Sequence, residues 1–219
     1  RDCSIQRRNQ KLIEECPSPI LNDMQRQEIY NISIKAMQNL RYQNIGTIEF
    51  LFQDGNFYFI EMNTRLQVEH PITELVYGID IVKEQIKIAY GKKIKFKQED
   101  IVRNGHSIEC RINAENPINF FPSSGNINSY HVPGGPGIRI DSALYTGLDI
   151  SNYYDGLIAK LVIHGKDREE CLMRLKRALL EFIIEGVDTT IPLYKNLIES
   201  KEKTNNIIVN MNMIGQSFL

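Results

Sequence analysis

The feature that most constrains this 219-residue chain is a pair of strand-like segments at residues 46–52 and 57–63. Aromatic and branched apolar residues dominate both segments, as is typical of buried strands. Gln53, Asp54 and Gly55 lie between them. A short polar connection that contains Asp-Gly is a strong signal for a β-hairpin. The chain is therefore expected to build part of its fold around an antiparallel pair of strands.

The length of the hairpin turn decides which side chains share a face. Each strand carries one acid, Glu49 in the first and Glu61 in the second. A two-residue turn would send the two carboxylates to opposite faces. A three-residue turn, with Gly55 in a left-handed bulge position, would pair Glu49 with residue 59 and bring both acids and Asn63 to one face. We expect the three-residue turn.

Polar side chains continue at every second position beyond the second strand. Arg65, Gln67 and Glu69 follow Asn63 at this spacing, and an extended chain would hold all of them on one side. Two carboxylates and an amide oxygen suit Mg²⁺ that keeps waters and takes other ligands from phosphates. From the hairpin alone, two solvated glutamates on an ordinary strand are an equal alternative. The continued polar register favours a nucleotide site.

Elsewhere the sequence mixes helices and strands. Helical spacing of apolar residues predicts helices over 22–40 and 81–90, and a third that begins after Asp167 and is ended by Gly186. Apolar and polar residues alternate over 106–115, as in a half-buried strand. Further strand-like segments follow in the sequences GNINSYHV and GLIAKLVIHG. The fold class is therefore α+β, with a domain boundary expected in the charged segment before the strand at 106.

Composition and charge exclude several classes of partner. Lys and Arg number 26 against 27 for Asp and Glu, so the net charge of -1 gives no field to gather nucleic acid or an anionic membrane. The four cysteines form no C-x-x-C pair, which favours free thiols in a reducing compartment. No apolar run approaches the roughly 20 residues that span a bilayer. We expect a cytoplasmic protein, or one of the plastid stroma, and a chain that is part of a longer one.

The segment EMNTRLQVEHP, residues 61–71, resembles the signature of biotin carboxylases, ATP-grasp enzymes that carboxylate biotin from bicarbonate. Further blocks resemble the same family in the same order: RDCSIQRRNQK, GHSIECRINAE, FPSSG, PGGPGIRIDS and YYDGLIAKL. The resemblance implies the C-terminal part of an ATP-grasp domain over 1–97, followed by the biotin carboxylase C-terminal domain over 106–219. The chain departs from the family pattern at Asn9, where histidine is frequent, and at Ser124, where proline is common.

The resemblance implies a nucleotide and metal site on the hairpin. Glu49 and Glu61 would bind the Mg²⁺ or Mn²⁺ that bridges the phosphates of ATP, and Asn63 would assist them. Gln6 would lie near the ribose of the nucleotide or near bicarbonate. The sequence shows no glycine-rich phosphate loop, so we expect the rest of the nucleotide site to come from other sequence and this piece alone to be inactive.

The resemblance also implies a bicarbonate and biotin site. Four groups would hold bicarbonate: Lys11, Arg65, Gln67 and the backbone of Val68. Glu69 would deprotonate bicarbonate, and Arg111 would stabilise the biotin enolate. From the sequence alone, Lys11 reads as part of a solvated basic stretch, and Arg111 as a surface partner of Glu109 or Glu115 on its own strand.

As a whole, the resemblance implies the biotin carboxylase component of acetyl-CoA carboxylase, which works in fatty acid synthesis. Its expected partners are a biotin carboxyl carrier protein, carboxyltransferase subunits and a second copy of itself. The first alternative is the same domain in a pyruvate, propionyl-CoA or methylcrotonyl-CoA carboxylase. Other ATP-grasp ligases, such as carbamoyl-phosphate synthetase, should lack the RINAE and YYDGLIAKL segments. A non-catalytic dimerising or carrier-docking module would not need all of the acids and cations named above.

Overall fold

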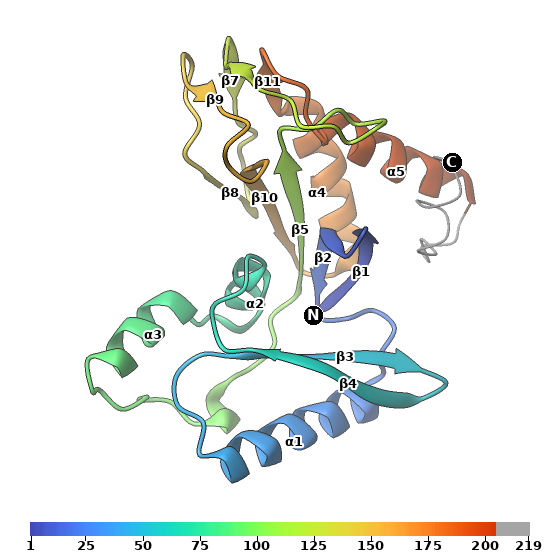
Figure 1. Ribbon diagram of the computed structural model, residues 1–219. Helices are drawn as coiled ribbons and strands as arrows, with labels where there is room; N and C mark the ends of the chain where they lie inside the picture. Colours follow the sequence, from blue (N-terminus) through green and yellow to red (C-terminus); the bar gives the residue numbers. More distant parts are fainter. Residues whose placement is uncertain (205–219) are drawn as a thin grey trace. The chain divides into compact units, whose positions relative to one another are not determined.

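A computed structural model describes the backbone of residues 1–204, and it divides the chain into two compact units (Figure 1). The first unit joins residues 1–17 to the part of the chain from Gly105 onward, and the second contains Ser18–Asn104. The stretch 205–219, with which the expected C-terminal domain ends, lies outside the described residues. No helix within the described part is long and apolar enough to cross a membrane.

The second unit contains the expected hairpin, made of β3 (Thr47–Gln53) and β4 (Asn56–Asn63). Its turn has two residues, because Gln53 pairs with Asn56. Asp54 and Gly55 both have positive φ angles, of 52° and 80°, as a type I′ turn requires. The expected three-residue turn is therefore wrong.

A β-bulge in β4 restores the alignment that the two-residue turn would lose. Phe50 pairs with Phe59, but the next residue of β3, Glu49, pairs with Glu61, so Ile60 is the extra residue. A bulge of this kind shifts the register by one residue. The side chains of β4 beyond the bulge therefore point to the opposite face of the hairpin from the one that the turn alone would give them. Glu49 consequently lies directly opposite Glu61.

Helices accompany the hairpin in the second unit. The expected helices are confirmed as α1 (Asp23–Leu40), which Asn22 caps through a capping box, and α3 (Ile81–Ala89). A further helix, α2 (His70–Tyr77), was not predicted from the sequence patterns. Pro71 lies in its first turn, and Gly78 caps its C-terminal end. A short 3₁₀ turn, η1 (Gln98–Asp100), follows α3. The segment after β4 therefore leads into a helix.

The first unit is built on a five-stranded antiparallel sheet. Its strands, in spatial order, are β1 (Asp2–Arg7), β2 (Gln10–Cys16), β5 (His106–Asn113), β10 (Leu157–Gly165) and β8 (Ile138–Ser142). Two short pairs join β6 (Gly125–Asn126) to β9 (Asp149–Ile150), and β7 (Ser129–His131) to β11 (Ile183–Glu185). Because β2 pairs with β5, one sheet combines strands from both sides of the domain boundary expected between residues 97 and 106. The domain boundary itself stays a prediction.

Helix α4 (Arg168–Glu181) packs against β5 and β10, and α5 (Ile191–Thr204) packs against α4 (Figure 1). Asp167 caps α4 by accepting from the backbone N–H of Glu170. The apolar stripe of α4 is buried against the sheet, as expected: Cys171, Leu175, Ala178 and Leu179. The helix ends at Glu181 and not at Gly186, because the next residues pair with β7 as strand β11. The four cysteines are free thiols, as predicted.

Candidate active site

Four polar side chains of the second unit meet at the open end of the hairpin. The amide Nδ2 of Asn63 donates to Oε1 of Glu61 at 2.7 Å and to Oε1 of Glu49 at 3.3 Å. The amide Nε2 of Gln67 donates to the same oxygen of Glu49 at 3.2 Å. The structure therefore brings together four of the side chains to which the sequence assigns a site. We call Glu49, Glu61, Asn63 and Gln67 the hairpin cluster.

The hairpin cluster depends on the bulge at Ile60. With Glu49 opposite Glu61, Thr47 lies opposite Asn63, and alternate residues of a strand point to the same face. The two acids and the amide thus share a face, as expected, although the register that brings them together differs from the expected one.

The hairpin cluster fits a divalent cation with oxygen ligands. Two carboxylate oxygens from facing strands converge on one atom, Nδ2 of Asn63, which separates their negative charges. Mg²⁺ is commonly bound by one or two carboxylates together with substrate phosphates and water. No group of three or more His, Cys, Asp or Glu suited to a metal occurs in the described part of the chain. The hairpin cluster is therefore a partial site, of the kind that a nucleotide phosphate would complete.

The chain beyond Asn63 does not stay extended, so the expectation of one continuous polar edge is wrong. Strand β4 ends at Asn63, and residues 64–69 form an irregular connection to α2. Gln67 returns to Glu49 and is only 6% exposed, whereas Arg65 is exposed and donates to the carbonyl oxygen of Leu66 at 3.1 Å. Arg65 is thus open to a solute, while Gln67 is part of the hairpin cluster.

Glu69 is placed at the beginning of α2. Glu69 is 0% exposed. It occupies the N-cap position of α2, but its side chain makes no capping hydrogen bond there. Val68 precedes it, and the backbone N–H of His70 donates to the carbonyl oxygen of Gln67 at 3.3 Å. The first turn of a helix carries a partial positive charge that favours anions. The connection therefore ends with a buried carboxylate at a helix end that attracts negative charge.

Gln6 and Lys11 lie in the first unit, on a hairpin that the sequence patterns did not predict. They face each other across β1 and β2, and Gln6 donates through Nε2 to the carbonyl oxygen of Cys3 at 2.7 Å. The turn consists of Arg8 and Asn9, both with positive φ. The basic stretch is thus an ordered hairpin, and Lys11 is half-buried on its second strand.

Arg111 also lies in the first unit, on β5 next to β2. Its Nε donates to Oε1 of Glu14 at 2.6 Å, and Glu14 is 0% exposed. The sequence patterns suggested Glu109 or Glu115 on its own strand as the partner of Arg111, and this contact instead joins Arg111 to a neighbouring strand. Sequence patterns did not point to Glu14, because β2 is buried on both faces and shows no polar alternation.

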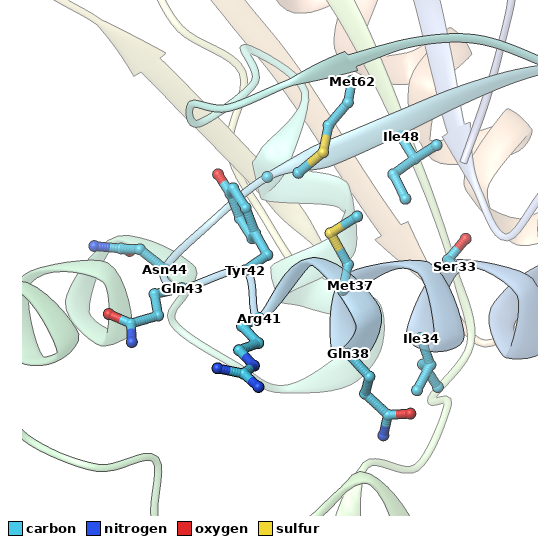
Figure 2. Close-up of a pocket in the computed structure, with 11 residues that line it drawn as sticks. Ser33, Ile34, Met37, Gln38, Arg41, Tyr42, Gln43, Asn44, Ile48 and Met62 are labelled. Atoms are coloured by element: carbon cyan, nitrogen blue, oxygen red, sulfur yellow. The ribbon is translucent and has the colours of Figure 1, made fainter.

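A cavity of about 670 Å³ lies beside the hairpin in the second unit (Figure 2). Ile48 and Met62 of the hairpin and Met37 of α1 line it together with residues of the loop after α1. None of the residues assigned to the site lines this cavity, and its lining contains no carboxylate. Because Ile48 and Met62 alternate with Glu49 and Glu61 along their strands, the cavity lies on the other face of the hairpin from the hairpin cluster.

Comparisons with known proteins divide the chain into two matched parts. Residues 1–97 match the model of the carbamoyl-phosphate synthase L chain ATP-binding domain, and residues 109–215 match the model of the biotin carboxylase C-terminal domain. The second match covers the RINAE and YYDGLIAKL segments, which other ligases with the first domain were expected to lack.

Individual relatives match across both parts. A pyruvate carboxylase subunit of Methanothermobacter thermautotrophicus is 53% identical over 202 residues, which cover 92% of this chain and 41% of that protein. Biotin carboxylase 1 of Bacillus subtilis is 54% identical over 202 residues, which cover 91% and 45%. The biotin carboxylase domain of Hydrogenobacter thermophilus 2-oxoglutarate carboxylase, solved with MgADP, ADP and bicarbonate, has a TM-score of 0.90 and 51% identity. That match covers 93% of this chain and 46% of the other.

These findings confirm the α+β fold class and the family resemblance. The chain spans less than half the length of the relatives described above. The two family models together match most of the residues of this chain. The chain belongs to the biotin carboxylase family of ATP-dependent ligases.

Proposed function

We propose that this chain supplies the metal, bicarbonate and biotin residues of an enzyme that carboxylates carrier-bound biotin with bicarbonate and ATP. The observation that carries the proposal is the hairpin cluster, in which Glu49 and Glu61 share the donor Asn63. Mg²⁺ or Mn²⁺ held by these three side chains would neutralise charge on the phosphates of ATP. The related domain solved with MgADP and bicarbonate supports this assignment.

Bicarbonate activation would use Arg65, Gln67, the backbone of Val68 and Lys11. Bicarbonate is a planar anion, and a guanidinium such as that of Arg65 presents a planar fork of donors to it. Glu69 would take the bicarbonate proton. An oxygen of bicarbonate then attacks the terminal phosphorus of ATP, the bond to the ADP oxygen breaks, and carboxyphosphate and ADP form. Fixed charges and positioning supply most of the catalysis in such a phosphoryl transfer.

Carboxyl transfer to biotin would use Arg111. When the ureido nitrogen of biotin loses its proton, negative charge develops on the ureido oxygen, and a fixed cation stabilises that charge. The nitrogen then bonds to the carboxyl carbon of carboxyphosphate, the bond from that carbon to the phosphate oxygen breaks, and the departing phosphate takes up the ureido proton. Gln6 would lie near the nucleotide, on the strand that pairs with that of Lys11.

Among biotin-dependent enzymes, we propose acetyl-CoA carboxylase in fatty acid synthesis as the parent, with a biotin carboxyl carrier protein, carboxyltransferase subunits and a second copy as partners. The relatives also include pyruvate carboxylase and 2-oxoglutarate carboxylase components, so a pyruvate, propionyl-CoA or methylcrotonyl-CoA carboxylase is the alternative. The proposed location is the cytoplasm. The plastid stroma is the alternative location, because one relative is the chloroplastic biotin carboxylase of Arabidopsis thaliana. Incubation of the gene-encoded protein with its biotinylated carrier, its carboxyltransferase subunits, labelled bicarbonate and candidate acceptors separates these parents.

The test of the activity is an ATP-cleavage assay on the protein as its gene encodes it. ATP cleavage should require bicarbonate and Mg²⁺ and should increase when free biotin is added. Cleavage that is indifferent to bicarbonate would contradict the proposal. A protein that binds the biotinylated carrier but neither binds nor cleaves ATP would instead be the non-catalytic docking module.

A further inference from the structure

We propose that Glu14 is a positioning residue for Arg111, which sets the direction of its guanidinium for carboxyl transfer. This inference rests on the proposed function of Arg111 and concerns a residue to which the family resemblance gave no role. The two residues lie on neighbouring strands of the five-stranded sheet, β2 and β5. Their contact joins Arg111 Nε to Glu14 Oε1 at 2.6 Å.

The register of the sheet explains why Glu14 reaches Arg111. Glu14 lies directly opposite Glu109, and Arg111 is the next residue of β5 on that same face. Diagonal neighbours of this kind are within reach of long side chains. A charge-assisted bond this short is among the stronger polar contacts in a protein. The sheet therefore fixes the carboxylate at one side of the guanidinium.

Glu14 holds the side chain of Arg111, and two other residues hold its backbone. The hydroxyls of Thr190 and Tyr194 both donate to the Arg111 carbonyl oxygen, the first at 3.1 Å. Tyr194 and Thr190 are both 0% exposed. Because backbone and side chain are each anchored, Arg111 has little freedom to change its direction.

The atom used in the contact gives it a directional effect. Glu14 binds Nε, at the base of the guanidinium, while four of the five N–H donors of an arginine are on the two terminal nitrogens. Fixing Nε fixes the plane of the group and the direction of those nitrogens. A displacement of about 1 Å can reduce the rate of an enzyme about a hundredfold. Loss of the Glu14 contact should therefore impair transfer to biotin.

The adjacent acid of β2 provides a matched control. Glu15 is also buried, and it pairs with Arg168 at 2.7 Å and with His106 at 2.9 Å. It lies directly opposite Ile108 on β5, and so points to the other face of the sheet from Glu14. Glu15→Gln removes a buried charge from the same strand without touching the contact to Arg111.

The experiment measures two rates in the gene-encoded protein: bicarbonate-dependent ATP cleavage without biotin, and carboxyl transfer to free biotin. In Glu14→Gln and Glu14→Asp, the ratio of transfer to cleavage should fall at least about tenfold, with the KM for biotin raised. In Glu15→Gln the ratio should stay at the wild-type value. Adding Glu14→Gln to Arg111→Ala should lower transfer no further, because the two residues act as one unit.

Three results would overturn the inference: an unchanged ratio in both Glu14 variants, an equal fall in Glu15→Gln, or additive losses in the double variant. The Asp variant keeps the charge, so it covers the case in which Glu14→Gln fails to fold. Failure of the proposed function looks different. If Arg111→Ala itself transfers carboxyl groups at the wild-type rate, the role of Arg111 is wrong; if it does not, only the role of Glu14 is under test.

Discussion

Glu49 faces Glu61 across the β3–β4 hairpin because Ile60 is an extra residue in β4, and not because of the length of the turn. A two-residue turn in a regular hairpin would have turned the two carboxylates away from each other. The bulge returns them to one face, where Asn63 donates to both. A local irregularity thus creates the hairpin cluster.

Neutralising either acid should weaken the binding of MgATP. Glu49→Gln and Glu61→Gln each remove one negative charge that would hold the cation, and we expect the Kd for ATP in the presence of Mg²⁺ to rise at least about tenfold. Isothermal titration calorimetry with and without Mg²⁺ measures this change. Glu28→Gln, on the exposed surface of α1, is the control. Unchanged MgATP affinity in both variants would remove the metal role.

The two-residue turn can be tested by substitutions at its two positions. Gly55 has φ of 80° with nothing near an added Cβ, so Gly55→Ala should cost about 1 kcal/mol through backbone strain alone. Asp54 also has a positive φ, of 52°, so Asp54→Gly should be neutral within about 0.5 kcal/mol. Urea unfolding measures both free energies. A clear loss in Asp54→Gly would contradict the type I′ turn.

Glu69→Gln should abolish bicarbonate-dependent ATP cleavage while nucleotide still binds. The substitution keeps the size of the buried side chain but removes the base, and loss of a positioned base typically costs about a hundredfold or more in rate. Steady-state kinetics and a nucleotide-binding titration provide the two readouts. Glu74→Gln is the control, because Glu74 lies in the same helix but has no role in the proposed site. Its carboxylate contacts His70 and accepts from the backbone N–H of Ile81 at the start of α3. Wild-type turnover in Glu69→Gln would exclude Glu69 as the base.

The first unit should lose stability in acid through Glu15. Burial alone would raise the pKa of this carboxyl, but hydrogen bonds and charges from His106 and Arg168 outweigh it and lower the pKa from 4.5 to about 2. A lowered pKa adds stability above the unfolded value, and this stability is lost as the pH falls from 4.5 through about 2. The expected contribution is roughly 3 kcal/mol.

The comparison of wild type with Glu15→Gln isolates this effect. Urea unfolding at several pH values between 6 and 2 should show the wild type losing more stability than the variant across the lower part of that range. Parallel curves for the two proteins would show that Glu15 does not carry the pH dependence.

Much of the local structure follows from sequence patterns. The helices beginning after Asn22 and Asp80 have periodic apolar faces and capping side chains, and both form where expected. The two acids of the hairpin cluster and Asn63 are also evident from spacing, whereas Gln67 reaches Glu49 through the irregular connection after β4. Such features depend on neighbours a few residues apart, which a sequence shows directly.

The features that the sequence patterns did not predict either lack a clear local signal or depend on distant partners. The bulge at Ile60 has no local signal, and the turn at Arg8 and Asn9 has no glycine to mark its positive φ angles. Glu14 and Glu15 are buried on opposite faces of β2 because each meets a cation from elsewhere in the chain. Helix α4 ends early because the chain after Glu181 pairs with β7. The burial of Glu14 and Glu15 and the end of α4 are thus set by tertiary contacts rather than by local preference.

The transfer of labelled carbon from bicarbonate to biotin tests the central claim most directly. The gene-encoded protein, given ATP, Mg²⁺, free biotin and ¹⁴C-bicarbonate, should form acid-labile ¹⁴C-carboxybiotin. Label should appear only when ATP is present, and Glu61→Gln should reduce its formation at least about tenfold. Absence of labelled biotin from a folded protein that binds MgATP, or full labelling by Glu61→Gln, would contradict the account.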